Sequence, residues 1–271
     1  MYAILLMQNY LKGELMGKII SFINQKGGVG KTTTCVNVAA YLAEMGKNVL
    51  LVDMDPQGNA SSSVGINKED KHKTIYNVIV NEEEITSIIL NTNFENLDVI
   101  PSDVDLAGAE IDLVEIPNRE KVLRKAISKV KDNYDYICLD CPPSLGLITV
   151  NALTASDSVV IPIQCHYFAL EGLSVLMYTL KLVKKHLNPD IDVEGVVLTM
   201  KDGRSNLDQS VADDINKYFK EKVYKTIIPR NVRLAEAPSY GQPISAYDPK
   251  STGGVAYKKL TEEFLERNTK G

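Results

Sequence analysis

Residues 26–32 read Lys-Gly-Gly-Val-Gly-Lys-Thr, directly after a strand-like run at residues 18–24. The glycines allow backbone N–H groups to turn inward around phosphate oxygens, and a helix that begins after them adds its positive end. Lys31 can then reach the β- and γ-phosphates of a nucleotide, and the Thr32 hydroxyl can hold Mg²⁺. This stretch predicts a phosphate-binding loop between a strand and a helix.

The sequence on either side favours this interpretation over a chance glycine turn. The run before the loop is rich in β-branched and aromatic residues, which is typical of a buried strand. Apolar residues then recur at helical spacing through residues 36–43, until Gly46 ends the predicted helix. The usual motif has a glycine five residues before Gly30, where this chain has Gln25, and here Lys26 stands at the front. The loop is therefore a deviant form of the motif.

The whole chain has 271 residues, of which 44% are hydrophobic, and this is enough to bury the core of one large α/β domain. No long Pro/Gly/Ser-rich linker, internal repeat or low-complexity tract divides it, so we expect a single domain at residues 16–271. Met16 resembles a natural translation start just before the first predicted strand. We therefore expect residues 1–15 to be an N-terminal extension that is disordered, or the result of a misassigned start. A membrane-surface helix is the alternative, although Lys12 is the only basic residue there.

The cysteines are Cys35, Cys138, Cys141 and Cys165, and they show no disulfide-rich pattern. The chain also has no signal-sequence pattern and no apolar run long enough to span a bilayer, so we expect a cytoplasmic protein. The Cys-x-x-Cys spacing, together with Cys165-His166, leaves a zinc or iron–sulfur site as an alternative. Small buried thiols are the commoner explanation of such residues.

Two further strands are predicted to lead into acidic residues. Residues 48–53 form a buried strand that brings Asp53 and Asp55 to its end, and residues 134–139 form another that leads into Asp140. Ligands of open α/β sheets bind at the carboxyl edge of the strands, so these acids are expected to face the nucleotide. Asp140 resembles the acid of a Walker B strand, which holds Mg²⁺, usually through a water. Taken alone, each acid would be interpreted as a cap or turn residue, but its place after a phosphate-binding loop favours the site.

The remaining chain continues the alternation of strands and helices. Residues 74–131 are predicted to be mainly helical, with a short strand near residues 97–100. Two strand–helix units follow, with strands at residues 158–163 and 193–200 and helices at residues 170–186 and 207–219. The sequence therefore predicts the α/β class, with a doubly wound, mostly parallel sheet flanked by helices on both faces.

A basic stretch lies at residues 215–233, where six basic side chains stand against Glu221 alone, a local charge of +5 in a chain of net charge −5. The basic residues are Lys217, Lys220, Lys222, Lys225, Arg230 and Arg233. A basic patch on an acidic protein suggests a polyanion partner, and Arg204 in the preceding loop extends it. The alternative is a solvated helix face plus loop, and acidic residues just before the stretch argue against a wholly basic surface.

Four blocks of sequence stand in a characteristic order. They are the phosphate-binding loop through Thr33, residues 53–59 (Asp-Met-Asp-Pro-Gln-Gly-Asn), residues 134–136 (Tyr-Asp-Tyr) leading to residues 140–146 (Asp-Cys-Pro-Pro-Ser-Leu-Gly), and residues 228–234 (Ile-Pro-Arg-Asn-Val-Arg-Leu) with Glu236-Ala237-Pro238. Together they resemble the Soj/ParA family of DNA-partitioning ATPases, in its short chromosomal form without an N-terminal helix-turn-helix domain. The resemblance runs from about Met16 nearly to the end of the chain.

The resemblance implies a P-loop ATPase that uses ATP and Mg²⁺ and works as a homodimer, with two ATP molecules sandwiched at the interface. Lys26 would reach across the interface to the partner's nucleotide and act much like an arginine finger. Lys31 and Asp55 complete the implied catalytic set, in which Asp55 positions the attacking water. Thr32 and Asp140 match the residues that hold Mg²⁺.

The same resemblance assigns further roles. Asp53 matches a residue that orients the group of side chains around Mg²⁺. Arg204 and Arg233 match the arginines that hold nonspecific double-stranded DNA once the dimer has formed. The other implied nucleotide-binding residues are Gly27, Gly28, Val29, Gly30 and Thr33 around the phosphates, and Pro229, Arg230 and Asn231 near the adenine.

The function implied is that ATP-bound dimers coat the nucleoid until a ParB-type centromere-binding protein stimulates hydrolysis and releases them. This cycle segregates or positions chromosome origins, with slow turnover in the absence of DNA and partner, and it places the protein in the cytoplasm, associated with the nucleoid. The main alternative is a MinD-like membrane-surface positioning ATPase, which needs an amphipathic, basic C-terminal helix. Residues 257–270 instead mix acidic with basic residues, so we expect this helix to pack on its own body, with no membrane partner.

Two kinds of metabolic enzyme and a binding-only protein fit the sequence less well. A nitrogenase-type iron protein needs paired cluster cysteines at the dimer axis, and no cysteine lies between Cys35 and Cys138. An ATP-dependent amide-forming enzyme needs a substrate pocket that the sequence does not identify. A relic that binds nucleotide without turnover is disfavoured because the implied catalytic and metal-binding residues are intact.

Overall fold

The computed structural model describes residues 17–70, 72–166, 169–201 and 206–269. The predicted extension at residues 1–15 lies outside the described residues, and so does Arg204.

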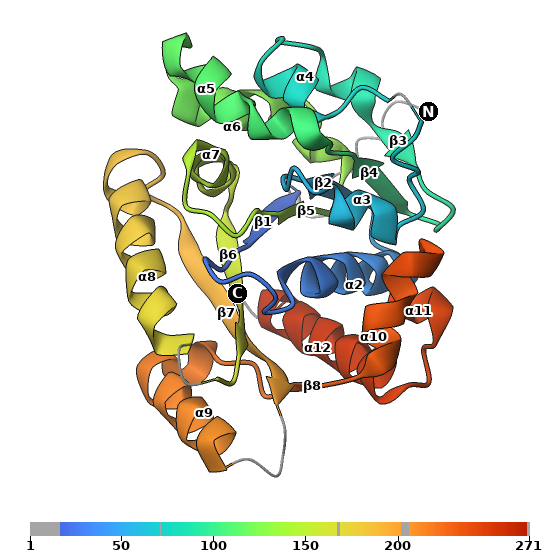
Figure 1. Ribbon diagram of the computed structural model, residues 1–271, viewed down its shortest axis with the longest axis vertical. Coiled ribbons are helices and arrows are strands. Elements are labelled where there is room, and N and C mark those ends of the chain that lie inside the picture. The colour runs from blue at the N-terminus through green and yellow to red at the C-terminus, as the bar shows by residue number, and fades with distance from the viewer. Residues whose placement is uncertain (1–16, 71, 167–168, 202–205, 270–271) are drawn as a thin grey trace, which may run out of the picture.

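The fold is built on one eight-stranded sheet in the order β3-β4-β2-β5-β1-β6-β7-β8 (Figure 1). Neighbouring strands are parallel except β3 and β4, which are antiparallel. The strands are β1 Lys18–Phe22, β2 Val49–Asp53, β3 Leu90–Asn91, β4 Leu97–Ile100, β5 Tyr136–Asp140, β6 Ser158–Gln164, β7 Asp192–Lys201 and β8 Ile228–Pro229. The predicted doubly wound, mostly parallel sheet is confirmed.

Helices cover both faces of the sheet (Figure 1). One face carries α2 Lys31–Glu44, α3 Asn59–Ser63, α10 Val232–Glu236, α11 Ile244–Tyr247 and α12 Thr252–Thr269. The other carries α4 Ile75–Ile79, α5 Ala109–Asp112, α6 Val122–Ile127, α7 Leu147–Ala155, α8 Ala169–His186 and α9 Asn206–Phe219. Each layer encloses its own apolar core against the sheet.

The two cores explain why the central strands are largely apolar on both faces, although β1 also carries the buried Ser21, whose hydroxyl is hydrogen-bonded to that of Ser156. Successive side chains of a strand point to opposite faces, so Ile19 of β1 packs in one core while Ile20 and Phe22 pack in the other. A parallel strand covered by helices on both faces therefore has no solvent-facing side that would select polar residues.

The segment at residues 74–131 differs in detail from its prediction. The strand β4 is present where it was predicted, and the segment does contain helices, but these are short: α4, α5 and α6 have four to six residues each. Short 3₁₀ turns stand between them at Ile85–Ile88, Val104–Ala107, Leu113–Glu115 and Arg119–Lys121. The antiparallel edge strand β3 was not predicted, because a run of two residues carries no periodicity.

The C-terminal helix α12 packs on the body of the protein, as predicted. Tyr257, Leu260 and Phe264 are buried in the same core as α2, and the Phe264 ring lies edge-on to Tyr136 with ring centroids 5.5 Å apart. Asn268, near the end of the helix, donates a hydrogen bond to Glu194 in β7 at 2.9 Å. No described helix is both long enough and apolar enough to cross a bilayer.

Candidate functional site

The predicted phosphate-binding loop connects β1 to α2 (Figure 1). Gly28 and Gly30 have φ of +73° and +85°, a left-handed conformation that residues with a side chain rarely adopt. A Cβ at Gly27 or Gly28 would meet no other atom within 4 Å, so the space in front of the loop is open. The helix α2 begins at Lys31 without a side-chain cap, which leaves its first N–H groups for an anion.

Two neighbouring strands hold the loop in place. The side-chain amide of Asn24 donates to the carbonyl of Pro162 in β6 at 2.7 Å, and its oxygen accepts the N–H of Lys26 at 2.9 Å. From β7, the hydroxyl of Thr199 donates to the carbonyl of Val29 at 2.8 Å. Sequence analysis identified neither Asn24 nor Thr199, because these contacts depend on the order of strands in the sheet.

The side chain of Lys31 is buried, with 7% of its surface exposed. Within the described part of the chain, no carboxylate forms an ion pair with its ammonium group. A buried charge without a partner is costly, so an anion bound at the head of α2 stabilises this arrangement. Thr32 and Thr33 follow in the same helical turn and are half-buried.

The strand β5 lies between β1 and β2 and brings the predicted acids together. Asp140 is in register with Phe22 on one side and with Asp53 on the other, and both carboxylates are fully buried. The Asp53 carboxylate accepts hydrogen bonds from the N–H of Asp55 at 3.1 Å and from the N–H and hydroxyl of Ser61 at 2.8 and 2.7 Å. Neither oxygen of Asp140 has a hydrogen-bonding partner among the described residues.

The two buried carboxyls affect each other's ionisation. Burial raises the pKa of Asp140 well above its ordinary value and the charge of Asp53 raises it further, whereas the nearby Thr32 hydroxyl and Lys31 lower it. The Thr32 hydroxyl favours the charged form of Asp140 without reaching the geometry of a hydrogen bond. Burial also raises the pKa of Asp53, against the lowering effect of the hydrogen bonds from Ser61. Such a pair stays charged when a cation lies beside it.

The donor set fits Mg²⁺. The orphaned oxygens of Asp140 and the hydroxyl of Thr32 are oxygen donors, and Mg²⁺ usually takes one or two ligands from the protein and the rest from phosphates and waters. The described residues include no group of three or more His, Cys, Asp or Glu side chains that could hold a metal by themselves. Asp55 lies at the edge of this cluster, 8% exposed, and its carboxylate accepts the N–H of Gln57 at 2.9 Å.

The cysteines are all free and buried in the two cores. Burial raises the pKa of the thiols of Cys138 and Cys141 to about 12, with the charge of Asp140 contributing at Cys141. These thiols therefore pack as small apolar side chains.

Ser61, in α3, holds Asp53 in place and was not identified from the sequence. Its hydroxyl donates to Asp53 and accepts the N–H of Ser102, which follows β4, at 3.2 Å. One buried hydroxyl thus joins the ends of β2 and β4. The only signal in the sequence is a run of serines at residues 61–63, which does not show which of them is functional.

We predict that Ser61→Ala lowers the free energy of unfolding by about 1–3 kcal/mol, because it leaves the N–H of Ser102 buried without a partner and removes a donor from Asp53. The rate of ATP hydrolysis should fall more than the affinity for ATP. Denaturant unfolding and steady-state phosphate release measure the two effects. Ser62→Ala is the matched control, since the Ser62 hydroxyl bonds only the carbonyl of Gly58 in its own turn. Equal effects of the two substitutions would show that the link to Asp53 has no special role.

The segment predicted to lie near the adenine leaves the sheet from β8. Pro229 ends this strand, which pairs with β7 beside Thr199, and the side chain of Arg230 is exposed. Asn231 caps α10 by accepting the N–H of Arg233 at 2.8 Å, and its amide donates to the hydroxyl of Thr252 at 2.7 Å. Within the described residues, no hydrogen bond joins this segment to the phosphate-binding loop.

A separate contact ties the neighbouring α11 to the start of α2. Asn37 donates its amide to the carbonyl of Thr33 at 2.7 Å and accepts the N–H of Ile244 at 2.7 Å. The first turns of α2 and the start of α11 therefore keep a fixed relation. Sequence analysis also missed this asparagine.

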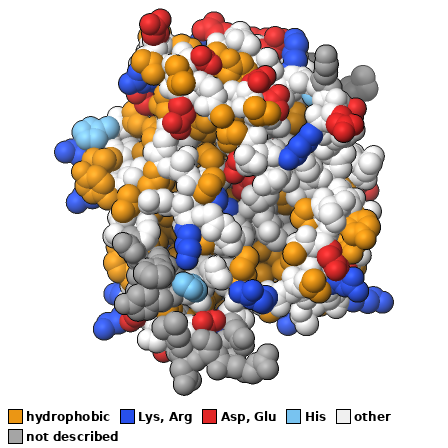
Figure 2. Space-filling view, in the orientation of Figure 1, with side chains coloured by type: hydrophobic (Ala, Val, Ile, Leu, Met, Phe, Trp, Pro, Cys, Tyr) orange, Lys and Arg blue, Asp and Glu red, His pale blue; other side chains and the backbone are white. Residues whose placement is uncertain are grey.

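The structure does not bring the basic stretch into one free patch. Arg233 is ion-paired with Glu236 at 2.9 Å, and Lys222 is ion-paired with Asp192 at 2.8 Å. Acidic and basic side chains are dispersed over the face seen in Figure 2. Fewer basic side chains of this stretch are therefore free to contact a polyanion than the charge count suggests.

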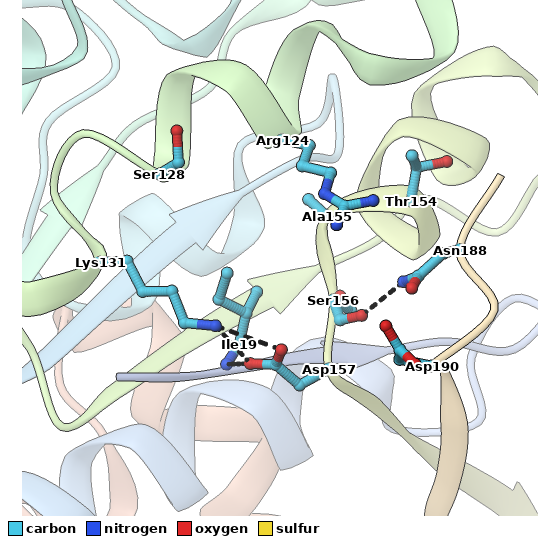
Figure 3. A pocket seen from close by; sticks show the side chains of 10 residues that line it. All are labelled: Ile19, Arg124, Ser128, Lys131, Thr154, Ala155, Ser156, Asp157, Asn188 and Asp190. Carbon is cyan, nitrogen blue, oxygen red and sulfur yellow. Dashed lines mark hydrogen bonds and ion pairs between the residues drawn. The ribbon is translucent and has the colours of Figure 1, made fainter. Parts of the chain in front are cut away.

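A hollow of about 220 Å³ lies beside the first residues of β1, at the opposite end of the strand from the phosphate-binding loop (Figure 3). Lys131 and Asp157 form an ion pair across it at 3.1 Å, and the amide of Asn188 donates to the carbonyl of Ser156 at 2.7 Å. Its lining consists of Ile19, Arg124, Ser128, Lys131, Thr154, Ala155, Ser156, Asp157, Asn188 and Asp190. Ligands of such sheets bind at the other edge, where the acids and the loop lie.

A deviant phosphate-binding loop on a doubly wound sheet, with acids at the end of β5, which lies beside β1, and at the end of β2, which lies beside β5, defines a P-loop ATPase. A family model described as an AAA domain matches residues 17–193. The chain is 60% identical over 248 residues to the sporulation initiation inhibitor protein Soj of Bacillus subtilis, covering 92% of this chain and 98% of the relative. The chain therefore belongs to the Soj/ParA family of chromosome-partitioning ATPases, which confirms the resemblance found in its sequence.

Solved structures agree on the fold. The cobyrinic acid a,c-diamide synthase of Mycobacterium smegmatis with bound ADP and magnesium has a TM-score of 0.82 at 32% identity, covering 94% of this chain and 96% of that one. The cell division ATPase MinD of Pyrococcus furiosus has a TM-score of 0.76 at 29% identity, covering 93% and 99%. The first is an amide-forming enzyme and the second a MinD protein, and both are less similar to this chain in sequence than Soj is.

Proposed function

We propose that this ATPase is a nucleotide-controlled switch that partitions DNA. With ATP and Mg²⁺ bound, two copies form a homodimer that sandwiches two nucleotides and binds nonspecific double-stranded DNA. A ParB-type centromere-binding protein then stimulates hydrolysis and releases the dimer from the nucleoid, so that chromosome origins are segregated or positioned. The observation that carries the proposal is the buried ammonium of Lys31 near the buried oxygens of Asp140, which have no ion-pair or hydrogen-bond partner among the described residues. The charges of this site are complementary to a magnesium–nucleotide complex.

Each residue of the site has a role in this proposal. Lys31 contacts the phosphates, and Thr32 and Asp140 hold Mg²⁺, which neutralises negative charge on the phosphates when bound. Asp53 fixes the backbone of Asp55, whose carboxylate orients the attacking water. Lys26 acts in the site of the partner subunit.

The rest of the nucleotide site is formed by the phosphate-binding loop and by the residues at the end of β8. The loop from Gly27 to Thr33 surrounds the phosphates, and residues 229–231 lie near the adenine. The whole unit at residues 16–271 acts as one ATPase domain, associated with the nucleoid through its DNA contacts.

DNA binding is the property that tests the proposal most directly. Arg204 and Arg233 are the proposed phosphate contacts, and a dimer doubles them, so the affinity for an arbitrary duplex should be about tenfold or more higher with ATP than with ADP. Affinity with ATP should fall steeply as salt rises, because phosphate contacts release counterions. Arg233→Glu should abolish binding while ATP affinity persists.

The measurement is fluorescence anisotropy of a labelled duplex across a salt series, with Lys125→Glu as the charge-matched control. Lys125 is exposed on α6, on the face of the sheet opposite to α10. No binding of the wild-type protein with either nucleotide would overturn the proposal and favour the membrane-surface or metabolic relatives. Liposome sedimentation then separates those two.

A further inference from the structure

We propose that Glu236 and Asp248 compete with DNA for Arg233, so that the DNA-binding surface carries its own acidic inhibitor. This inference rests on the proposed DNA-binding function and identifies a regulatory contact within that site. It starts from the finding that an arginine expected to contact phosphate is already bound to carboxylates of its own chain.

The contacts around Arg233 form a small network. One guanidinium nitrogen of Arg233 lies 2.9 Å from a carboxylate oxygen of Glu236, and Nε lies 3.6 Å from Asp248. The hydroxyl of Tyr247 donates to the same Glu236 oxygen at 3.3 Å. About half of the Arg233 side chain, 51%, is exposed, and 39% of Glu236 and 35% of Asp248 are exposed as well. The network therefore lies where a polyanion can reach it.

The backbone around the network is held by a cap and by close packing, which keeps the charged residues near one another. Asn231 caps α10 and is joined to Thr252 at the start of α12. A Cβ at Gly253 would lie 2.6 Å from Cγ of Leu234, so α10 packs as close to α12 as a glycine allows. Within α10, Arg233 and Glu236 are one turn apart, which keeps their side chains on the same side.

A DNA phosphate must displace these carboxylates before it can use the guanidinium fork of Arg233. The two negative charges also repel the incoming phosphate. An exposed ion pair is worth only about a factor of two in an equilibrium constant, so the inhibition is weak for each subunit. A dimer carries the network twice and multiplies the effect, while it also doubles the phosphate contacts that overcome it. Glu236 and Asp248 therefore lower the DNA affinity of the monomer and of the dimer. Tight binding then requires the phosphate contacts of both subunits of a dimer.

The test measures the affinity of full-length protein for a labelled duplex of arbitrary sequence, with ATP and with ADP, at low and high salt. Glu236→Gln keeps an oxygen that can accept from Tyr247, and Asp248→Asn keeps the oxygen that accepts the N–H of Ser251. Either substitution should lower Kd about fourfold with ATP and about twofold with ADP. The gain should shrink at high salt, because screening weakens both the ion pairs and the repulsion. Unchanged ATP affinity shows that the variants are folded.

Glu115→Gln is the control, since it removes the same charge from an exposed residue on the other face of the sheet. An equal gain from Glu115→Gln would mean that net charge alone is responsible, and it would overturn the inference. Unchanged affinity of both Glu236→Gln and Asp248→Asn, in a protein whose binding is lost in Arg233→Glu, would overturn the inference and leave the proposed function intact. Absence of DNA binding by the wild-type protein would overturn both.

Discussion

Asp55→Ala is expected to lower the rate of ATP hydrolysis by about 10²- to 10⁴-fold while ATP affinity changes only a few-fold. The reason lies in how Asp55 is held. Its N–H is bonded to Asp53, its carboxylate accepts the N–H of Gln57, and it lies at the edge of the buried acid cluster with 8% of its surface exposed. A carboxylate fixed in this way can orient a water, and Asp55 is not among the residues proposed to contact the phosphates.

The consequence for the switch is a trapped state. Because release depends on hydrolysis in the proposed cycle, Asp55→Ala should remain a dimer with ATP and stay on DNA, while the wild-type protein should dissociate as ATP is consumed. Phosphate release and the retention of labelled duplex after excess competitor DNA measure the two effects. Asp55→Asn is the matched control, since it preserves shape and can still accept from Gln57, and it should be equally inactive. Hydrolysis by Asp55→Ala at the wild-type rate would remove Asp55 from the catalytic set.

The parts of the site that could be predicted are those determined by local sequence and one topological rule. The phosphate-binding loop is a continuous stretch whose glycines have the backbone angles that the motif requires. Asp53 and Asp140 are more than eighty positions apart in sequence, yet both end apolar strands, and parallel strands bring their carboxyl ends to the same edge. The sequence therefore predicted that these carboxylates would meet, and the structure places them in register.

The parts that could not be predicted depend on which strands are neighbours and on how short helices pack. Thr199 contacts the loop across 170 positions because β6 lies beside β1 and β7 lies beside β6, and the order of strands cannot be read from any single segment. Ser61 could not be distinguished from the two serines beside it until its hydrogen bonds to Asp53 and Ser102 were known. The basic stretch was evaluated by counting charges along the sequence, but Arg233 and Lys222 find acidic partners through tertiary packing. Charge composition cannot anticipate such pairs.

Lys26→Ala is expected to reduce ATP hydrolysis by about 10³-fold, because a cation that acts on the partner's nucleotide resembles an arginine finger. Lys31, buried at the head of α2, is the lysine proposed to contact the subunit's own nucleotide. Lys26 precedes the glycine turn, with its backbone N–H held by Asn24, and its side chain is half-buried. ATP binding to the isolated subunit should therefore persist in Lys26→Ala.

Mixing two inactive variants before ATP is added tests whether Lys26 acts on the nucleotide of its own subunit or on that of the partner. In a mixed dimer of Lys26→Ala and Asp55→Ala, the site of the Lys26→Ala subunit keeps its own Asp55 and receives an intact lysine from its partner. The other site lacks both residues. Because a twofold-symmetric interface makes each subunit complete the other, an equal mixture should recover up to about a quarter of the wild-type rate. If Lys26 acted within its own subunit, neither site of the mixed dimer would be complete and the mixture would stay inactive. Recovery of activity on mixing thus requires both that the protein dimerises around ATP and that Lys26 reaches across the interface. If crosslinking detects heterodimers but the mixture stays inactive, Lys26 does not act on the partner's nucleotide.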